Sequence, residues 1–179
     1  MLADTDRLHY LINNLLMAAR LEQRRKQPER RLTDLTLLVN DYVERERAAL
    51  PQGGSILCHA EPGLTAMVDP EEMSMVLRNL FENAVLYSPQ SPDIVVKLAR
   101  IGTMLHLTVQ DHGRGLDKKE RKNIFERFYR VQPPDDTIRG TGLGLYIVET
   151  VIKGYGGKVG VISEGLGKGC TFTVKLPAA

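Results

Sequence analysis

The 179-residue sequence predicts an α+β domain in which a layered sheet packs against helices. Strand and helix candidates are mixed along the chain and do not alternate as regular β-α-β units. Two strand pairs near the C-terminal half are joined by glycine-containing turns, as in hairpins. The length suits one domain with its own core and a short appendage. These observations favour a layered α+β sheet over a doubly wound parallel one.

Composition excludes several classes of function. The net charge is only +2 and the charged residues of both signs are interspersed, so no nucleic-acid footprint is visible. The basic clusters at residues 24–26 and 30–31 are not interleaved with aromatic residues, and we interpret them as solvated linker surface. No signal peptide opens the chain and no apolar run reaches the ~18 residues of a membrane span. Cys58 and Cys170 lie far apart without a C-x-x-C motif, as expected for reduced cysteines of a cytosolic protein.

The first element is a helix over residues 4–25. Its apolar residues recur at spacings of 3, 4 and 7 and form one stripe: Leu8, Leu11, Ile12, Leu15, Leu16 and Ala19. Such a stripe needs partner helices, because a large apolar patch does not remain in water. We expect a homodimer through residues 8–19, or packing of this helix on a neighbour, and an end at Gln27 and Pro28.

The remaining elements follow from periodicity and turn signals. They are a helix at 34–50, strands at 55–59 and 64–68, a helix at 70–87, strands at 94–101 and 104–110, a short helix near 118–125, a helix ending near 154, and strands at 158–163 and 170–176. The helix at 70–87 has the clearest start. Asp69 can cap it, Pro70 suits its first position, and two glutamates favour its first turn.

The stretch RGTGLGLYIVET, residues 139–150, places Gly140, Gly142 and Gly144 before an apolar helix. A dinucleotide-binding fingerprint is excluded because the glycines follow a Pro-Asp loop instead of a strand. A P-loop is excluded because no G-K-[ST] follows the glycines. A helix N-terminus with bare main chain suits a polyphosphate. A closely packed, glycine-rich helix start is the alternative that the spacing leaves open.

Asparagines and an aspartate supply further candidate chemistry. Asn79 and Asn83 share the flank of the helix at 70–87, where they are either solvated amides or oxygen ligands for Mg²⁺. Glu82 points away from the core and either orients a water or is simply exposed. Tyr87 either stacks on a base or ends the core stripe. Asp111, at a strand end before two glycines, either accepts a purine amino group or belongs to an ordinary turn.

Taken together, these segments resemble the N, G1, F and G2 boxes of sensor histidine kinases. The matching stretches are Asn79 to Asn83, Asp111 to Gly115, IFERF at 124–128 and Gly140 to Gly144; GKGCTFTVKLP at 167–177 resembles the end of the same ATP-binding domain. Residues 1–27 resemble the second helix of the dimerisation and phosphotransfer hairpin with its linker, and 28–179 the catalytic domain. The resemblance implies a two-layer α/β sandwich, the Bergerat fold, with a mixed sheet of about five strands under three helices.

The resemblance also implies roles for single residues. Asp111 holds the adenine amino group, with Tyr87 beside the base and Thr171 nearby. Asn83 binds Mg²⁺, Asn79 lies close to the phosphates, and these two with Glu82 form the catalytic set. Residues 116–139 form an ATP lid anchored by Phe125 and Phe128. The remaining expected nucleotide contacts are Gly113, Gly115, Leu116, Phe128, Arg130, Gly140, Thr141, Gly142, Leu143, Gly144 and Leu145.

The implied activity is transfer of the γ-phosphoryl of Mg-ATP to a histidine, for onward signalling to a response regulator. The implied partners are the protein's own dimerisation domain, mostly absent from this chain, and a receiver domain, with no nucleic acid. The implied location is cytoplasmic, with any membrane contact made through preceding segments. Related ATPases that hydrolyse ATP carry an acid where Asn79 stands, and asparagine cannot act as a base. The resemblance therefore implies that ATP is held without fast hydrolysis.

Some residues depart from the family pattern. The acceptor motif H-E-x-x-x-P is absent, because none of His9, His59, His106 and His112 precedes a glutamate. We therefore expect no autophosphorylation by this chain alone. His112 replaces the more usual Asn or Thr after Asp111, and we expect it to be exposed.

A further departure lies before Tyr87. Leu86 stands where lysine is common, so one phosphate contact is either missing or supplied by Arg78, Arg130 or Arg139.

Two other classes of function compete with the kinase. A nucleotide-binding interaction module that controls dimer geometry or phosphatase activity is one, although the present F and G2 boxes favour ATP use. A kinase of Ser/Thr on an anti-sigma partner is the other, and the helix at 4–25 argues against it because such proteins lack one.

Overall fold

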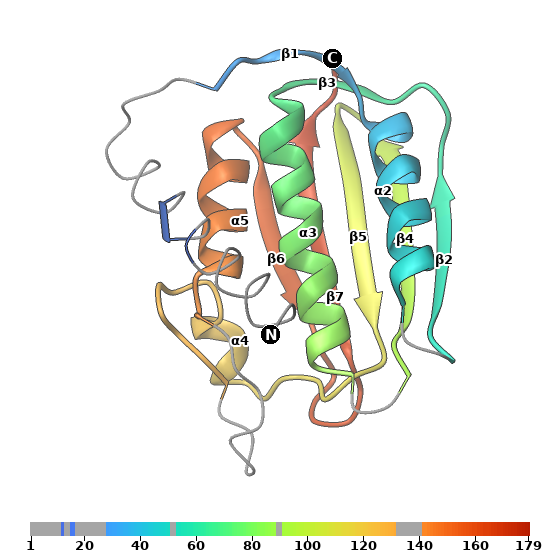
Figure 1. Cartoon of the computed structure of the whole chain (residues 1–179). Coiled ribbons are helices and arrows are strands. Elements are labelled where there is room, and N and C mark those ends of the chain that lie inside the picture. The colour runs from blue at the N-terminus through green and yellow to red at the C-terminus, as the bar shows by residue number, and fades with distance from the viewer. Residues whose placement is uncertain (1–11, 13–14, 17–27, 51–52, 89–90, 132–140) are drawn as a thin grey trace.

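The computed structural model describes residues 12, 15–16, 28–50, 53–88, 91–131 and 141–179. These residues form two layers, with a five-stranded mixed sheet covered on one face by three helices (Figure 1). The predicted α+β class and two-layer sandwich are confirmed. The core lies between the layers, where the buried side chains of the sheet meet those of the helices.

The sheet has the spatial order β2 (Ser55–Ala60), β4 (Asp93–Ile101), β5 (Met104–Asp111), β7 (Cys170–Pro177) and β6 (Lys158–Ile162). The β2 and β4 strands are parallel, and the other neighbours are antiparallel. The helices on its face are α2 (Leu35–Ala49), α3 (Pro70–Leu86) and α5 (Gly144–Gly154), and α4 (Glu120–Asn123) is a short turn near the start of α5 (Figure 1).

Helix α3 occupies the middle of the helical layer. The Asp69 side chain accepts hydrogen bonds from the N–H groups of Glu71 and Glu72, and Pro70 takes the first helical position, as predicted. The helix ends at Tyr87, whose N–H donates to the carbonyl of Asn83. Its buried face includes Phe81, whose ring lies 5.2 Å from that of Tyr42 in α2, together with Met73, Val76, Leu77, Leu80 and Ala84.

Strand β5 shows how the core leads to the site. Leu105, Leu107 and Val109 alternate with partly exposed residues and are buried under the helices. Burial of each such side chain contributes about 1.5–3 kcal/mol. The next residue on this face is Asp111, so the same alternation that fills the core ends in a buried carboxylate at the C-terminal end of the strand.

One element was not predicted. Strand β1 (Arg31–Asp34) pairs antiparallel with β3 (Thr65–Val68) in a separate two-stranded sheet. Its four residues are mostly polar and its partner lies far along the chain, so periodicity gives no signal for it. The strands predicted on either side of Glu61 to Gly63 exist, but they belong to different sheets.

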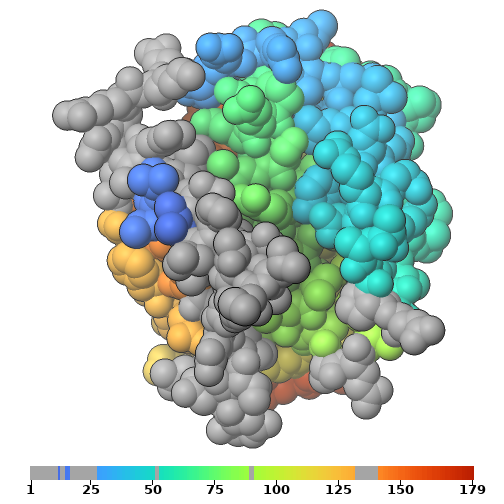
Figure 2. Space-filling model, in the orientation of Figure 1, coloured from blue at the N-terminus to red at the C-terminus, as the bar shows by residue number. Residues whose placement is uncertain are grey.

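Most of the predicted N-terminal helix lies outside the described residues, and so does most of its predicted dimer contact at residues 8–19. The described members Ile12, Leu15 and Leu16 are helical and are about half exposed. They form the isolated dark-blue patch in Figure 2. Within the described part of the chain, no helix is long and apolar enough to cross a membrane.

Candidate functional site

A cavity of about 680 Å³ lies among the C-terminal half of α3, the end of β5, the start of α5 and the segment 114–131. Tyr87, Asp111, Gly115 and Leu116 line one part of it. Its lining also includes Glu82, Asn83, Arg130, Gly142, Gly144 and Leu145. Segments that are far apart in the sequence therefore meet around one space, as the family resemblance implies.

Asp111 is fixed in the wall of this cavity. Its Oδ1 accepts hydrogen bonds from the N–H of Gly113 at 2.9 Å and the N–H of Cys170 at 3.2 Å. Burial raises the pKa of Asp111, and these two N–H groups act against that rise. The result is an oriented acceptor in a buried wall, which suits a ligand that carries an amino group.

The glycines after Asp111 are required by close packing. A Cβ on Gly113 would lie 2.3 Å from the carbonyl oxygen of Tyr87, and a Cβ on Gly115 would lie 2.1 Å from that of Gly165. Gly115 also has φ of +70°, which favours glycine. Gly113 itself is not part of the cavity lining; it lets the loop pack against the end of α3 and so places Asp111.

Tyr87 and two arginines share this part of the cavity. Burial raises the pKa of the Tyr87 hydroxyl, and the positive charges of Arg130 and Arg114 act in the opposite direction. All three residues line the cavity. Arginine side chains near the lining provide positive charge for an anionic ligand.

The two asparagines of α3 have different surroundings. Asn79 is 1% exposed and its Nδ2 donates to the carbonyl of Met75 at 3.0 Å. Its Oδ1 faces α5 so closely that a Cβ on Gly144 would lie 2.8 Å away. Asn79 is therefore not a solvated amide, and it lies behind the cavity against the start of α5. Asn83 lines the cavity itself.

Glu82 is the acidic residue of α3 in the lining. Its Oε1 lies 4.0 Å from Nε of Arg78, and its side chain is about two-fifths exposed. The pair is too open for a large stabilising contribution. Glu82 therefore has access to the cavity, and Arg78 lies beside it on the same helix.

The glycines before α5 allow a close approach of two main-chain segments. Gly142 has φ of +69°, and a Cβ there would lie 2.6 Å from the carbonyl carbon of Phe128. The Gly142 carbonyl accepts from the N–H of Phe128 at 3.0 Å. Thr141 Oγ1 accepts from the N–H of Leu143, whose side chain is buried in the core and does not enter the cavity. Gly140 and Arg139 lie outside the described residues.

Two further residues expected to contact the nucleotide, Phe128 and Thr171, do not line the cavity in this structure. Phe128 is predicted as a lid anchor and nucleotide contact, but its side chain is 56% exposed and its φ is +63°. Phe125, in contrast, packs partly buried against the core. Its neighbours Tyr129 and Arg130 line the cavity.

The other of these two residues is Thr171. Asp111 pairs with Cys170 across the strands, and Thr171 pairs with Gln110, so Thr171 faces the opposite side of the sheet. Cys170 lines the cavity in its place. Burial, and then the nearby Asp111 carboxylate, raise the pKa of the Cys170 thiol to about 12, so the thiol is neutral.

Sequence reasoning also missed Arg114 and the end of α2. Arg114 lies between the two glycines of its loop, and that position alone is the signal that it enters the site. Glu46 and Leu50 line the cavity because α2 packs beside α3. No local pattern marks them, because their place depends on tertiary packing.

Comparison with protein families gives one match over more than half of the chain. Residues 68–179 match the family described as histidine kinase-, DNA gyrase B-, and HSP90-like ATPase.

The chain is also similar to curated proteins. It is 31% identical over 179 residues to the sensor-like histidine kinase SenX3 of Mycolicibacterium smegmatis, covering 99% of this chain and 46% of that protein. It is 35% identical over 176 residues to the sensor histidine kinase RppB of Synechocystis sp., covering 96% of this chain and 38% of that protein. The chain thus spans less than half the length of these relatives.

Solved structures share the fold. The crystal structure of full-length ShkA in complex with AMPPNP has a TM-score of 0.85 and 28% identity, with 99% of this chain and 37% of that chain covered. The structure of the mycobacterial sensor histidine kinase MprB has a TM-score of 0.72 and 26% identity, with 83% of this chain and 97% of that chain covered.

Proposed function

The chain belongs to the histidine kinase-, DNA gyrase B- and HSP90-like ATPase family, and from this premise we propose that it binds Mg-ATP as the catalytic domain of a sensor histidine kinase. In this proposal the γ-phosphoryl of ATP is transferred to a histidine on a dimerisation domain and then to the receiver domain of a response regulator. Residues 1–27 belong to the dimerisation part and residues 28–179 form the catalytic domain, on the cytoplasmic side of any membrane.

The observation that carries the proposal is the Asp111 carboxylate. It is buried, oriented by two N–H groups, and lines the same cavity as Asn83 and the first residues of α5. We assign the adenine amino group to Asp111, with Tyr87 and Leu116 beside the base. The phosphates then lie toward Asn83, Gly142 and Gly144, where the N-terminus of an 11-residue helix favours negative charge.

The donor set fits Mg²⁺ better than a softer metal. Asn83 and Glu82 offer oxygen atoms, which Mg²⁺ prefers together with phosphate oxygens and water. Among the residues that the structure describes, no group of three or more His, Cys, Asp or Glu side chains is placed to hold a metal ion. We therefore assign the metal contact to Asn83, with the nucleotide itself supplying further oxygen ligands. When bound, Mg²⁺ neutralises developing charge on the phosphates.

The chain's own residues favour retention of the γ-phosphoryl over hydrolysis. Asn79 is buried, its Nδ2 donates to the carbonyl of Met75, its Oδ1 lies close to Gly144 at the start of α5, and it cannot accept a proton from water. Its proposed role is to hold α5 beside α3, which positions the main chain that surrounds the phosphates. Glu82, which reaches the cavity, is the residue we assign to orient the incoming acceptor group.

The test measures binding and transfer separately. A fluorescent ATP analogue is titrated into the chain with and without Mg²⁺, in competition with ATP and GTP. A separate helical fragment carrying an H-E-x-x-x-P motif is then added with labelled ATP. Preference for ATP over GTP, dependence on Mg²⁺ and an acid-labile label on the fragment support the proposal. Nucleotide binding without any transfer would favour the alternative, an interaction module controlled by nucleotide.

A further inference from the structure

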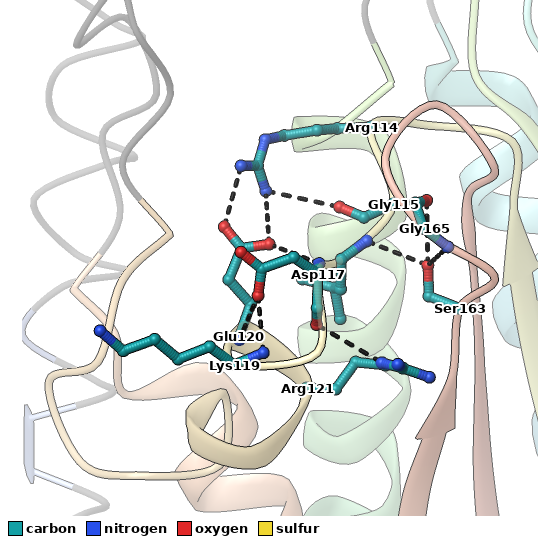
Figure 3. Close-up of polar contacts among 9 residues, drawn as sticks. Arg114, Gly115, Asp117, Lys119, Glu120, Arg121, Ser163 and Gly165 are labelled. Atoms are coloured by element: carbon teal, nitrogen blue, oxygen red, sulfur yellow. Dashed lines mark hydrogen bonds and ion pairs between the residues drawn. The ribbon is translucent and has the colours of Figure 1, made fainter.

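Arg114 joins the loop after β5 to the short helix α4 (Figure 3). Its Nη1 and Nη2 donate to Oε2 and Oε1 of Glu120 at 3.2 and 2.8 Å. Glu120 Oε2 also accepts from the N–H of Asp117 at 2.8 Å. The Asp117 carboxylate in turn accepts from the N–H groups of Lys119 and Glu120, both at 2.7 Å. The guanidinium is therefore bonded to a compact turn at the start of α4.

The main chain of Arg114 is held from other directions. Its N–H donates to the carbonyl of Tyr87 at 3.0 Å, and its carbonyl accepts from the N–H of Gly167. Ser163 accepts from the N–H of Leu116 at 3.0 Å and donates to the carbonyl of Gly169 at 2.7 Å, which fixes the same loop to the turn between β6 and β7. Arg114 thus projects from a fixed loop, and Glu120 is attached to that loop through it.

The Arg114–Glu120 ion pair is more buried than other ion pairs in the described part of the chain. Its side chains are 25% and 12% exposed, against 63% and 28% for Lys153 and Glu149. A bidentate, charge-assisted pair with little solvent is stronger than an exposed one. Loss of either partner leaves a charge in a poorly hydrated wall, which is unfavourable.

The wall of the cavity continues directly from α4. Ile124, Tyr129 and Arg130 follow this helix and line the cavity, and Arg114 lines it as well. We propose that Arg114 is a positioning residue that, through Glu120, holds this wall in place and so sets how long a nucleotide remains bound. The inference rests on the proposed function for the identity of the ligand.

Substitution of Glu120 distinguishes the positioning role of the ion pair from a direct effect of the Glu120 charge on the nucleotide. Glu120→Gln removes a negative charge near a cavity for an anionic ligand, so charge alone would slow dissociation of ATP. Loss of the ion pair would instead loosen the wall, and we expect the fluorescent ATP analogue to dissociate about fivefold faster or more, measured by stopped-flow displacement with excess ATP. Glu149→Gln, which breaks the more exposed pair with Lys153 and makes the same charge change, is the matched control and should leave the rate unchanged.

The ion pair also predicts that the effects of substituting Arg114 and Glu120 on the dissociation rate are not additive. Arg114→Gln breaks the pair and also removes a positive charge from the cavity lining, so it should accelerate dissociation at least as much as Glu120→Gln does. The double variant should resemble Arg114→Gln, because the pair is already broken in that variant. Arg114→Lys keeps the charge but not the two-pronged geometry, and should fall between Arg114→Gln and the unchanged chain. In the nucleotide-free variants, trypsin should cleave faster at Lys118, Lys119, Arg121 and Lys122 while cleavage elsewhere is unchanged.

Several outcomes would overturn the inference. One is that the ATP analogue dissociates from the Glu120→Gln variant more slowly than from the unchanged chain, or at the same rate. Another is that the two substitutions together accelerate dissociation by the product of their separate effects. Faster trypsin cleavage along the whole chain would show a general loss of folding instead. If the unchanged chain binds no ATP analogue at all, the proposed function fails, which is a separate result from unchanged dissociation in the variants.

Discussion

At the scale of single residues, Asp111 combines a burial that opposes ionisation with a proposed role in adenine binding. Its carboxylate is buried and fixed by Gly113 and Cys170. Asp111→Asn keeps Oδ1 for these two N–H groups but places an NH₂ donor where a ligand amino group needs an acceptor. We expect the preference for ATP over GTP to fall about tenfold or more. Competition titration measures it, and an unchanged preference would remove Asp111 from the adenine site.

The same substitution makes a prediction about stability. Burial raises the pKa of Asp111 from its ordinary 3.8, so the folded state holds the proton more tightly than the unfolded state. Ionisation therefore costs stability as the pH rises through the raised pKa, and the cost is absent below the ordinary value. Asp111→Asn stays neutral, and should raise the melting temperature by about 2–4 °C near neutral pH. The gain should shrink toward about pH 4, as followed by thermal unfolding across pH.

Asn83 and Asn79 should respond differently to substitution, although they lie one turn apart on α3. Asn83→Ala removes an oxygen in the cavity lining, and we expect most of the Mg²⁺-dependent gain in ATP affinity to be lost with little change in stability. Asn79→Ala removes a buried amide bonded to Met75, and should instead lower the free energy of unfolding by about 1–3 kcal/mol. Titrations with and without Mg²⁺, combined with urea unfolding, distinguish the two. Equal loss of Mg²⁺ dependence in both variants would contradict our assignment of the metal to Asn83.

Single residues also show where sequence reasoning stops. A strand end and a glycine loop are local features, and they pointed to Asp111 and Gly115, which line the cavity, and to Gly113, which does not. The resemblance named Thr171 near the base, whereas the strand register brings Cys170 to the cavity, since the face of a residue depends on its partner strand. The resemblance also named Phe128 as an anchor, and neither the exposure of its side chain nor its positive φ is visible in the sequence. Arg114 bonds to Glu120, which lies five residues after Gly115, and no local pattern in the sequence reveals this contact.

At the scale of elements, α3 and the glycine loop after β5 define the site together. The start and end of α3 could be predicted because the cap, the proline and the apolar period are all local. Strand β1 could not, because its four residues gain their structure only from pairing with β3. The order of the sheet likewise depends on which strands meet in three dimensions. Local signals in the sequence therefore predict most helices and strands, whereas the contacts between these elements are seen only in the structure.

The contact between the glycine loop and α3 can be tested directly. Gly113→Ala would place a Cβ 2.3 Å from the carbonyl oxygen of Tyr87, which main-chain atoms cannot accommodate without a shift. We expect the free energy of unfolding to fall by about 1–3 kcal/mol and ATP affinity to fall with it, because Asp111 moves with the loop. Gly160→Ala in β6, where no atom lies within 4 Å of the added Cβ, is the matched control. Urea unfolding and nucleotide titration of both variants provide the comparison.

At the scale of the whole molecule, the sheet separates two surfaces. The face that carries α2, α3 and α5 contains the core and leads to the cavity, because Asp111 ends the buried row of β5 (Figure 1). His59 and His106 alternate with inward-facing residues of β2 and β5, so they lie on the other face. His112 lies at the loop edge with Nδ1 3.4 Å from a carboxylate oxygen of Asp93, and its side chain is about half exposed.

This distribution predicts that the chain acts on a histidine supplied from elsewhere. Of the described histidines, none lines the cavity in which we place the γ-phosphoryl group. His9 lies outside the described residues, and it is not followed by the glutamate of the acceptor motif. We therefore expect no acid-labile, base-stable label on this chain after incubation with Mg-ATP labelled at the γ-phosphate, while a separate H-E-x-x-x-P fragment in the same tube becomes labelled. His9→Ala is the control, because a label that disappears with this substitution would identify His9 as an acceptor and show that the chain modifies its own N-terminal segment.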